Sequence, residues 1–407
     1  MPAKSSRGGS GWAFVMISIL RFVLCWELLV LCFSPHCEHH YVAGFQPQMS
    51  PLQTWELVDS RRSPVHALKA APTDVQIYEE KIEVRGEEMW YQIVAPSVQK
   101  LLATAHEPLV PLVCLHGGPG VPSAYLEPLG RLAEEYGRTV IFYDQLGCGN
   151  SGAPMDPAFY SPSLLHSDLL VLMAHLRDVH DLRACHLLGH SWGGCLACEA
   201  VLGVSHSSTG SPLIPGQDNG VFLLVPDVEL LSVVLSGAPS SIPLVEEEVG
   251  RLVEALAASS ASQQQGGADP EATKRRFLVE DSLFKAAHYC RLPETPACVA
   301  RALAGAGPPG VFRGTAAIPG WDARPALAAG RWPAELPALV LNGEHDFVTA
   351  ACVAPFAEHI PNCRAEALAG CSHLTYLEDE GAFLRAVQRF LEGAEGAAVR
   401  PRPAQRG

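Results

Sequence analysis

A serine flanked by glycines is the first residue pattern in this chain that points to chemistry. Gly189-His190-Ser191-Trp192-Gly193-Gly194 follows the apolar run Cys185 to Leu188 and precedes a helical stretch. This order predicts a strand, a sharp turn and a helix, with the serine hydroxyl exposed at the carboxyl edge of a sheet. Glycines suit such a turn because larger side chains would clash there. Ser191 is therefore the candidate nucleophile for covalent catalysis.

A serine hydroxyl is a weak nucleophile until a general base and an orienting carboxylate activate it. Asp346 follows an apolar run, and His373 lies in Gly370-Cys371-Ser372-His373, ahead of the last helical stretch. We expect His373 to accept the proton of Ser191 and to return it to the leaving group. Asp346 would fix the imidazole tautomer and stabilise its charged form.

A second glycine-rich segment follows the apolar run Leu109 to Leu115. This segment is His116-Gly117-Gly118-Pro119-Gly120, and its bare backbone can bring an N–H to the tetrahedral intermediate of acyl transfer. The second donor should be the backbone N–H of Trp192, directly after the nucleophile. A phosphate-binding loop is the alternative, but no Gly-Lys-Ser/Thr follows these glycines.

Short apolar runs that alternate with longer helical patterns must position these residues. The predicted strands are Gln76 to Val84, Glu88 to Val94, Leu109 to Leu115, Thr139 to Tyr143, Cys185 to Leu188, Leu231 to Leu235 and Leu339 to Leu341. The first two alternate apolar with polar residues around Arg85-Gly86-Glu87, which is typical of a hairpin. Ser163 to Leu182 and Ala382 to Leu391 have helical spacing. The pattern predicts an α/β fold with a mostly parallel sheet flanked by helices.

Shifts in composition divide the chain into segments. We predict a leader or anchor over 1–48, a first core part over 70–241 with a surface insertion at 203–226, a lid over 242–331, a second core part over 332–395 and a disordered tail over 396–407. The insertion is rich in Ser, Gly and Pro, and the tail is rich in Arg, Pro and Ala. Such compositions are typical of loops and unfolded segments.

The N-terminal segment predicts targeting. Residues 12–33 are mostly apolar and follow Lys4 and Arg7, the order found in a secretory leader or a membrane anchor. Arg21 and Glu27 would each cost about 2 to 3.5 kcal/mol near a bilayer centre, so a cleaved leader is favoured over an anchor formed by 12–33. We expect entry into the secretory pathway or a plastid; the final compartment is left open.

Composition limits the partners. The formal charge of -14 argues against nucleic acid, which requires clustered Lys and Arg. The 13 cysteines show no repeating spacing, and Cys195 and Cys198 lie in an apolar run, so we expect buried thiols. The segment His36 to His40 lacks a second ligand pair at zinc spacing. These residue patterns therefore predict no metal site, and the oligomeric state is left open.

Three motifs together resemble the proline iminopeptidase family of α/β-hydrolases. They are His116 to Gly120, Tyr143 to Ser151 and Gly189 to Gly194. Leu235 to Pro239 and Ser372 to Glu378 look most like its branch with the tricorn-interacting aminopeptidases. The resemblance implies an α/β-hydrolase fold with a helical lid. It also implies a serine aminopeptidase that removes N-terminal residues, often proline, from short peptides through an acyl-enzyme without metal or cofactor.

The resemblance also assigns roles. It favours Asp346 over its neighbours Glu344 and His345 as the acid, and it makes Gly118 the oxyanion donor of the glycine-rich loop. Members of that branch carry a Glu in the lid and an acid directly after the triad Asp. Neither acid is present here, and Phe347 follows Asp346. Because a substrate ammonium needs a carboxylate partner, the missing acids leave open an alternative, an esterase, lactonase or amidase for a small uncharged substrate.

Overall fold

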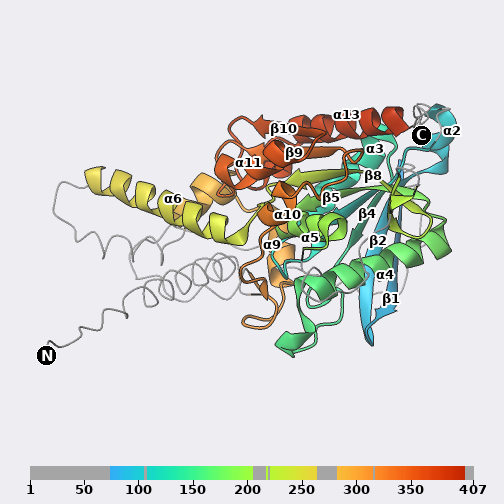
Figure 1. The fold of residues 1–407 in the computed structure, drawn as a ribbon, viewed down its shortest axis with the longest axis horizontal. Helices are drawn as coiled ribbons and strands as arrows, with labels where there is room; N and C mark the ends of the chain where they lie inside the picture. Colours follow the sequence, from blue (N-terminus) through green and yellow to red (C-terminus); the bar gives the residue numbers. More distant parts are fainter. Residues whose placement is uncertain are drawn as a thin grey trace, which may run out of the picture.

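A mostly parallel sheet lies at the centre of the part of the chain that the computed structural model describes, residues 74–104, 108–204, 217–218, 221–263, 282–314 and 317–398. The strands are β1 (Val75–Val84), β2 (Glu87–Pro96), β3 (Leu112–Leu115), β4 (Val140–Tyr143), β5 (Ala184–His190), β6 (Gln217–Asp218), β7 (Val221–Val225), β8 (Val228–Ser236), β9 (Ala338–Gly343) and β10 (Cys363–Leu368). From β4 the parallel order runs β4-β3-β5-β8-β9-β10, and β2 and β1 extend the β4 edge in antiparallel fashion (Figure 1).

The predicted hairpin at the start of the fold is confirmed. Val84 pairs with Glu87, so only Arg85 and Gly86 form the turn. Both have positive φ angles, 55° and 81°. Two consecutive left-handed residues match the twist of antiparallel strands, and glycine adopts that conformation without steric cost.

Helices cover both faces of the sheet. They are α2 (Val98–Thr104), α3 (Arg131–Tyr136), α4 (Pro162–His180), α5 (Trp192–Leu202), α6 (Ile242–Gln263), α8 (Ser282–Phe284), α9 (Ala297–Ala304), α10 (Arg324–Ala328), α11 (Ala350–His359), α12 (Thr375–Glu378) and α13 (Glu380–Ala398), with the 3-10 helices η1 (Ser123–Gly130) and η2 (Pro157–Phe159) and a π-helix (Lys285–Tyr289). In β3, Val113 packs in one core with α4 and α5, and Leu112 packs in the other with α3 and α13. The side chains of successive strand residues therefore pack into opposite layers, because side chains alternate between the two faces of a strand.

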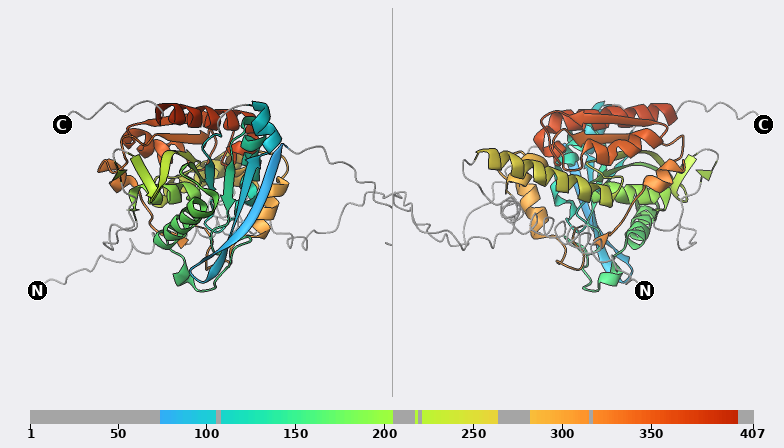
Figure 2. Two further views of the ribbon diagram at one scale, coloured as in Figure 1. Left: turned by 90° about the vertical axis from the view of Figure 1, so that its right-hand side faces the viewer. Right: turned by 60° about the vertical axis from the view of Figure 1, so that its left-hand side comes forward.

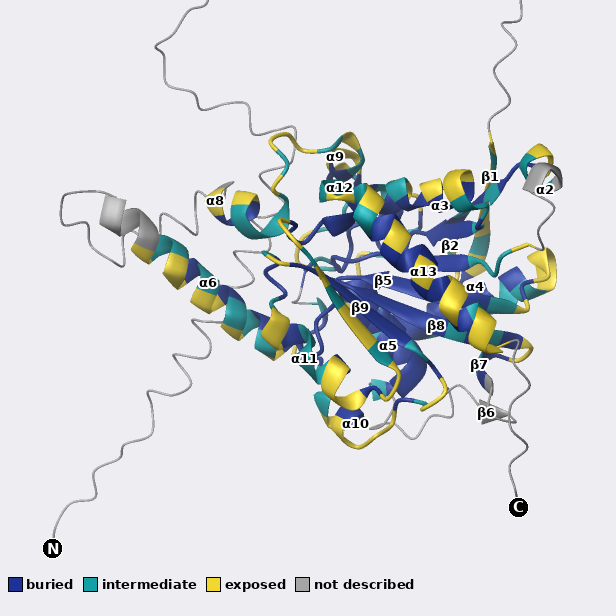
Figure 3. Ribbon diagram, turned by 90° about the horizontal axis from the view of Figure 1, so that it is seen from above, coloured by how far each residue is buried: buried dark blue, intermediate teal, exposed yellow. Residues whose placement is uncertain are grey.

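The last helix shows this layering in its own sequence. Phe383, Val387 and Leu391 of α13 recur at helical spacing and are buried. Figure 3 shows α13 with one buried and one exposed face, lying over the sheet. The predicted helix Ala382 to Leu391 is confirmed, and it extends to Ala398, beyond the predicted core boundary at 395.

The predicted surface insertion at 203–226 is wrong at its end. β7 lies inside that range and pairs antiparallel with β8 through a turn at Asp227, whose φ is 65°. Phe222 and Leu224 of β7 are buried in the core. The prediction was wrong because it followed the Gly, Ser and Pro content of the whole stretch and overlooked the apolar run of β7. Residues 205–216 and 219–220 lie outside the described residues.

The segment predicted as a lid lies between β8 and β9 in the chain. It contains α6, α8, the π-helix, α9 and α10. Figure 1 and the right-hand view of Figure 2 show α6 extending away from the sheet. Helix α6 continues to Gln263. That the segment acts as a lid stays a prediction.

The predicted leader or anchor over 1–48 and the tail beyond 398 lie outside the described residues. Among the helices that the structure describes, none has the length and apolar character to span a bilayer. The targeting prediction is untested by this result.

Candidate active site

Ser191 occupies a strained turn between β5 and α5. Its φ and ψ angles are 56° and -123°, a conformation that L residues rarely adopt. Its backbone N–H donates to the carbonyl of Ser236 at 2.9 Å. A Cβ at Gly189 would lie 2.3 Å from the Gly193 oxygen, and one at Gly193 would lie 1.9 Å from the Leu115 oxygen. The glycines of the motif are therefore required by close backbone packing.

Asp346 and His373 are brought together from two loops at the same edge of the sheet. The Asp346 Oδ1 atom lies 2.9 Å from His373 Nδ1, and both residues are buried. A carboxylate can only accept, so Nδ1 carries the proton and Nε2 keeps its lone pair. Among the described residues Nε2 makes no hydrogen bond, so it remains available as a base. The backbone N–H of Val348 fixes Asp346 Oδ1 at 2.8 Å.

Gly237 supports this pair from the end of β8. A Cβ there would lie 3.0 Å from both Asp346 Oδ2 and His373 Nδ1, and its φ is 51°. Its N–H donates to the Leu341 carbonyl at 3.1 Å, which ties β8 to β9 beneath the pair. Gly237 lies in a motif that carried the family resemblance, but no individual role was predicted for it.

The glycine-rich loop passes beside Ser191. A Cβ at Gly117 would lie 2.9 Å from the Cβ of Ser191. His116 Nε2 accepts from the Gln145 backbone N–H at 2.8 Å, so its Nδ1 carries the proton and donates to the Gly117 carbonyl at 3.1 Å. That carbonyl belongs to the same peptide unit as the Gly118 N–H. The peptide expected to supply an oxyanion donor is therefore held in place.

Gln145 connects the two segments that carry the expected oxyanion donors. Its side-chain amide donates to the His116 carbonyl at 2.9 Å and accepts from the Trp192 indole N–H at 3.0 Å. All three residues are buried. Sequence reasoning missed this role, although Gln145 lies in a motif that carried the family resemblance.

Aromatic side chains surround His373. The ring of Phe347 lies 4.2 Å from the imidazole and that of Tyr289 lies 5.8 Å away, centroid to centroid. The π-helix also holds both loops, because the N–H groups of Phe347 and Leu374 donate to the carbonyls of His288 and Tyr289 at 3.3 and 3.2 Å. The residue after Asp346 therefore presents an apolar ring beside the imidazole.

Other groups with chemically active side chains lie apart from this site. Cys195 and Cys198 are buried on α5, where burial raises the pKa of both thiols. A group of possible metal ligands outside the loops of Asp346 and His373 surrounds the Tyr91 hydroxyl at 2.5 to 3.1 Å; its members are Glu80, His175 and His180. Each of these three side chains is thus already hydrogen bonded.

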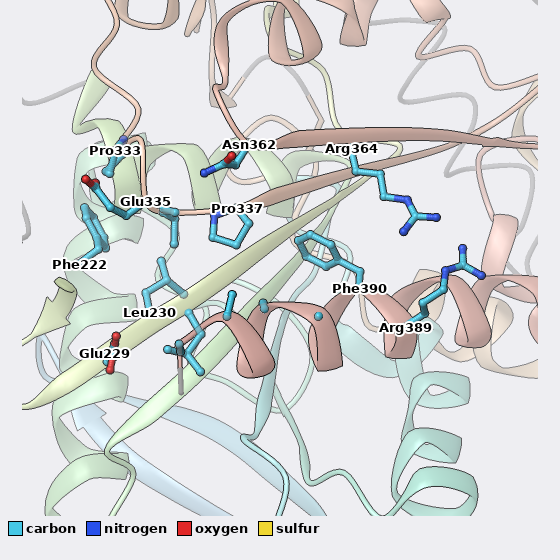
Figure 4. A pocket seen from close by; sticks show the side chains of 16 residues that line it. Phe222, Glu229, Leu230, Pro333, Glu335, Pro337, Asn362, Arg364, Arg389 and Phe390 are labelled. Atoms are coloured by element: carbon cyan, nitrogen blue, oxygen red, sulfur yellow. The ribbon is translucent and has the colours of Figure 1, made fainter. Parts of the chain in front are cut away.

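A cavity of about 560 Å³ lies between β8, β9 and α13, as Figure 4 shows. Its lining includes Leu230 near the start of β8 and Pro337 just before β9. Ser191 lies at the carboxyl ends of the parallel strands, so this cavity lies at the opposite end of the sheet from Ser191.

Comparison with known proteins identifies the family. Residues 112–386 match the model of the Alpha/beta hydrolase family. The chain belongs to the α/β-hydrolase family. The predicted fold class is thereby confirmed, and the protein is a hydrolase of that superfamily.

Individual relatives support the resemblance read from the motifs. A proline iminopeptidase of Lactobacillus delbrueckii subsp. lactis is 29% identical over 297 residues, 69% of this chain and 90% of the relative. One from Lactobacillus crispatus is 27% identical over 333 residues, 78% of this chain and 99% of the relative. The crystal structure of proline iminopeptidase from Mycobacterium smegmatis has a TM-score of 0.60 and 28% identity, covering 79% of this chain and all of that one (100%). The resemblance to proline iminopeptidases is confirmed, and the finer likeness to the tricorn-interacting branch stays a prediction.

Proposed function

We propose that this α/β-hydrolase is a serine aminopeptidase of proline iminopeptidase type, which removes N-terminal residues, often proline, from short peptides. The observation that carries the proposal is that a strained Ser191 lies at the same edge of the sheet as the Asp346–His373 hydrogen bond of 2.9 Å, in which His373 Nε2 has no partner among the described residues. The named relatives supply the substrate class.

The geometry supports an acyl-enzyme mechanism. Ser191 Oγ attacks the scissile carbonyl and His373 Nε2 takes its proton, while Asp346 stabilises the imidazolium. The N–H groups of Gly118 and Trp192 stabilise the oxyanion. The imidazolium then protonates the leaving amine, and water activated by His373 hydrolyses the ester on Ser191 to release the amino acid.

Recognition of a free amino terminus requires a carboxylate close to the site. Helix α6 packs in one apolar cluster with Phe347, which lies beside the imidazole of His373. Its Glu246 is half-buried and has no ion-pair partner among the described residues, and burial raises its pKa. Glu248 is already engaged, with Thr349 at 2.7 Å and Arg251 at 2.7 Å. We infer that Glu246 is the better candidate on this helix for pairing with a substrate ammonium.

The aromatic surroundings of His373 favour a second candidate function. Phe347 is 3% exposed and packs beside both Phe284 and Tyr289. An apolar wall at this position suits an esterase, lactonase or amidase for a small uncharged substrate, because such a substrate carries no ammonium that would need a charged partner.

A substrate panel distinguishes the two functions. Arylamides of proline and alanine, each with a free and a blocked amino group, are compared with simple aryl esters by kcat/KM. Aminopeptidase function predicts that the free amino group raises kcat/KM and that blocking it abolishes turnover. Equal or better turnover of blocked amides and esters would support the second function instead.

A further inference from the structure

Tyr125 and His190 form a chain of hydrogen bonds between two loops of the proposed active site. Tyr125 lies in η1, and His190 ends β5 directly before Ser191. The Tyr125 oxygen lies 2.6 Å from the Gly117 backbone nitrogen and 3.0 Å from His190 Nδ1. His190 Nε2 lies 3.0 Å from the carbonyl oxygen of His373. The chain thus connects the glycine-rich loop to the backbone of the proposed base.

The identity of each partner fixes the direction of every bond. A carbonyl can only accept, so His190 Nε2 must carry the proton that it donates to His373. Burial, together with repulsion by His373, lowers the pKa of His190 well below 6.5, so the ring is neutral at pH 7 with one N–H. Its Nδ1 therefore accepts from the Tyr125 hydroxyl, whose oxygen accepts the N–H of Gly117.

Burial makes every link of this chain costly to lose. Tyr125, His190 and His373 are 4%, 2% and 1% exposed, so water cannot easily replace a missing partner. His190 also pairs in register with Ser236 of β8, yet the Ser236 hydroxyl has no hydrogen-bond partner among the described residues. The imidazole is therefore oriented toward the two loops instead of toward its neighbour in the sheet.

We propose that Tyr125 and His190 are positioning residues of the hydrolytic reaction, an inference that rests on the proposed serine mechanism. They hold the backbones of Gly117 and His373 at a fixed separation on either side of Ser191. The Gly118 donor and the His373 base then stay aligned while the acyl-enzyme forms and breaks. A neutral His190 is also necessary because its ring lies 4.6 Å from that of His373, which becomes a cation during the reaction.

Tyr125→Phe tests the first link, with Tyr376→Phe as its matched control. The Tyr376 ring lies 6.3 Å from that of Tyr125 and 5.4 Å from that of His190, and its buried hydroxyl has no partner among the described residues. The readout is kcat for an aryl ester, divided by the fraction of protein that a fluorophosphonate labels. We expect kcat to fall roughly 10-fold in Tyr125→Phe with KM within about two-fold, and no change in Tyr376→Phe.

The aryl ester separates this inference from the proposed aminopeptidase function, because its turnover needs no amine recognition. If the wild-type protein neither turns over the ester nor reacts with the probe, the serine mechanism itself fails. If the wild type does both and Tyr125→Phe has the same kcat per labelled site, the positioning role is overturned.

A second pair of variants tests the link to His373 should Tyr125→Phe fail to fold. The side-chain amide of His190→Gln can still donate to the His373 carbonyl, whereas His190→Leu cannot. We expect the Gln variant to retain roughly 10-fold more kcat per labelled site than the Leu variant. A purely structural role would reduce the labelled fraction and the melting temperature of both while leaving kcat per site equal, and that result would contradict the proposal.

Discussion

Among the described residues, two buried histidines that bind carboxylates have different properties. At the edge that carries Ser191, His373 Nδ1 binds Asp346 at 2.9 Å, and Nε2 has no hydrogen bond among the described residues. Deeper in the sheet, His186 binds Ser232 Oγ at 2.7 Å through Nδ1 and Glu395 at 3.3 Å through Nε2. The first pair is open at one nitrogen and the second is closed at both.

The two pairs also differ in whether an arginine neutralises the carboxylate. The guanidinium of Arg138, whose side chain is fully buried, lies 2.7 Å from Glu395 and neutralises it. No cation other than His373 itself pairs with Asp346 among the described residues, and Asp346 Oδ2 has no hydrogen-bond partner there. A carboxylate whose charge an arginine already neutralises, such as Glu395, stabilises the fold. A carboxylate without such a cation, such as Asp346, can instead stabilise the positive charge that its histidine acquires. A histidine–carboxylate pair therefore indicates catalysis only when one ring nitrogen stays available.

Replacing the serine near each pair should give the largest effect, on kcat at the first pair and on stability at the second. Ser191→Ala should lower kcat by on the order of 10⁶-fold, because covalent catalysis is lost, while thermal unfolding stays unchanged. Ser232→Ala is the matched control, and it should instead cost about 1 to 3 kcal/mol of stability, since His186 Nδ1 loses its partner. Turnover and melting temperature are measured for both. If more than a few per cent of turnover survives in Ser191→Ala, the nucleophile is misassigned.

Replacing each carboxylate by its amide should have the next largest effect. Asp346→Asn should lower kcat on the order of 10⁴-fold, because an amide N–H opposite Nδ1 favours the wrong imidazole tautomer. Glu395→Gln makes the same chemical change in the closed pair and should leave kcat unaltered.

Glu344 provides the test of this assignment. Its carboxylate is exposed and accepts the Gly370 N–H at 2.9 Å, away from the imidazole. A loss of kcat in Glu344→Gln comparable to that in Asp346→Asn would require reassignment of the acid.

The open pair could be predicted from sequence and the closed one could not. Ser191 stands in a motif whose glycines are required locally, and Asp346 and His373 follow strands at one edge of the sheet, so the order of elements already places them together. Arg138 and Glu395 meet because α13 packs on the sheet, which no local pattern encodes. Tyr125 and Gln145 were missed for the same reason, since their partners come from other loops.

The free energy of unfolding at acid pH should reveal the contribution of the closed pair, because Glu395 must be ionised to make it. Burial raises the pKa of Glu395, but hydrogen bonds from His186 and Arg138 and the charge of Arg138 outweigh it and lower the pKa to about 2. The unfolded carboxyl titrates near its ordinary value of 4.5, so between these values the unfolded state binds more protons. The contribution is fully present above about pH 5 and decreases as the pH falls toward 2.

We expect this contribution to be about 2 kcal/mol at neutral pH, allowing for the partial exposure of Glu395. Urea unfolding of the wild type and Glu395→Gln from pH 6 to pH 3 measures it. The difference in unfolding free energy between the two proteins should shrink as the pH falls. A difference that stays constant over this range would show that Glu395 is not held in its charged form by Arg138 and His186.

The smallest expected effect concerns a carboxylate that could bind the substrate ammonium, because Phe347 and not an acid follows Asp346. Glu246 is half-buried without an ion-pair partner among the described residues, whereas the adjacent Glu247 is exposed. If Glu246 binds the substrate ammonium, Glu246→Gln should raise KM for a free prolyl arylamide by up to about 10-fold, the loss of one charge-assisted hydrogen bond of roughly 1.4 kcal/mol, and should leave kcat unchanged. KM for a blocked amide or an aryl ester should not move, and Glu247→Gln should resemble the wild type with every substrate. Equal increases in KM for free and blocked substrates would mean that Glu246 shapes the pocket without recognising the amine, and the aromatic wall around His373 would then favour the uncharged substrates of the second function.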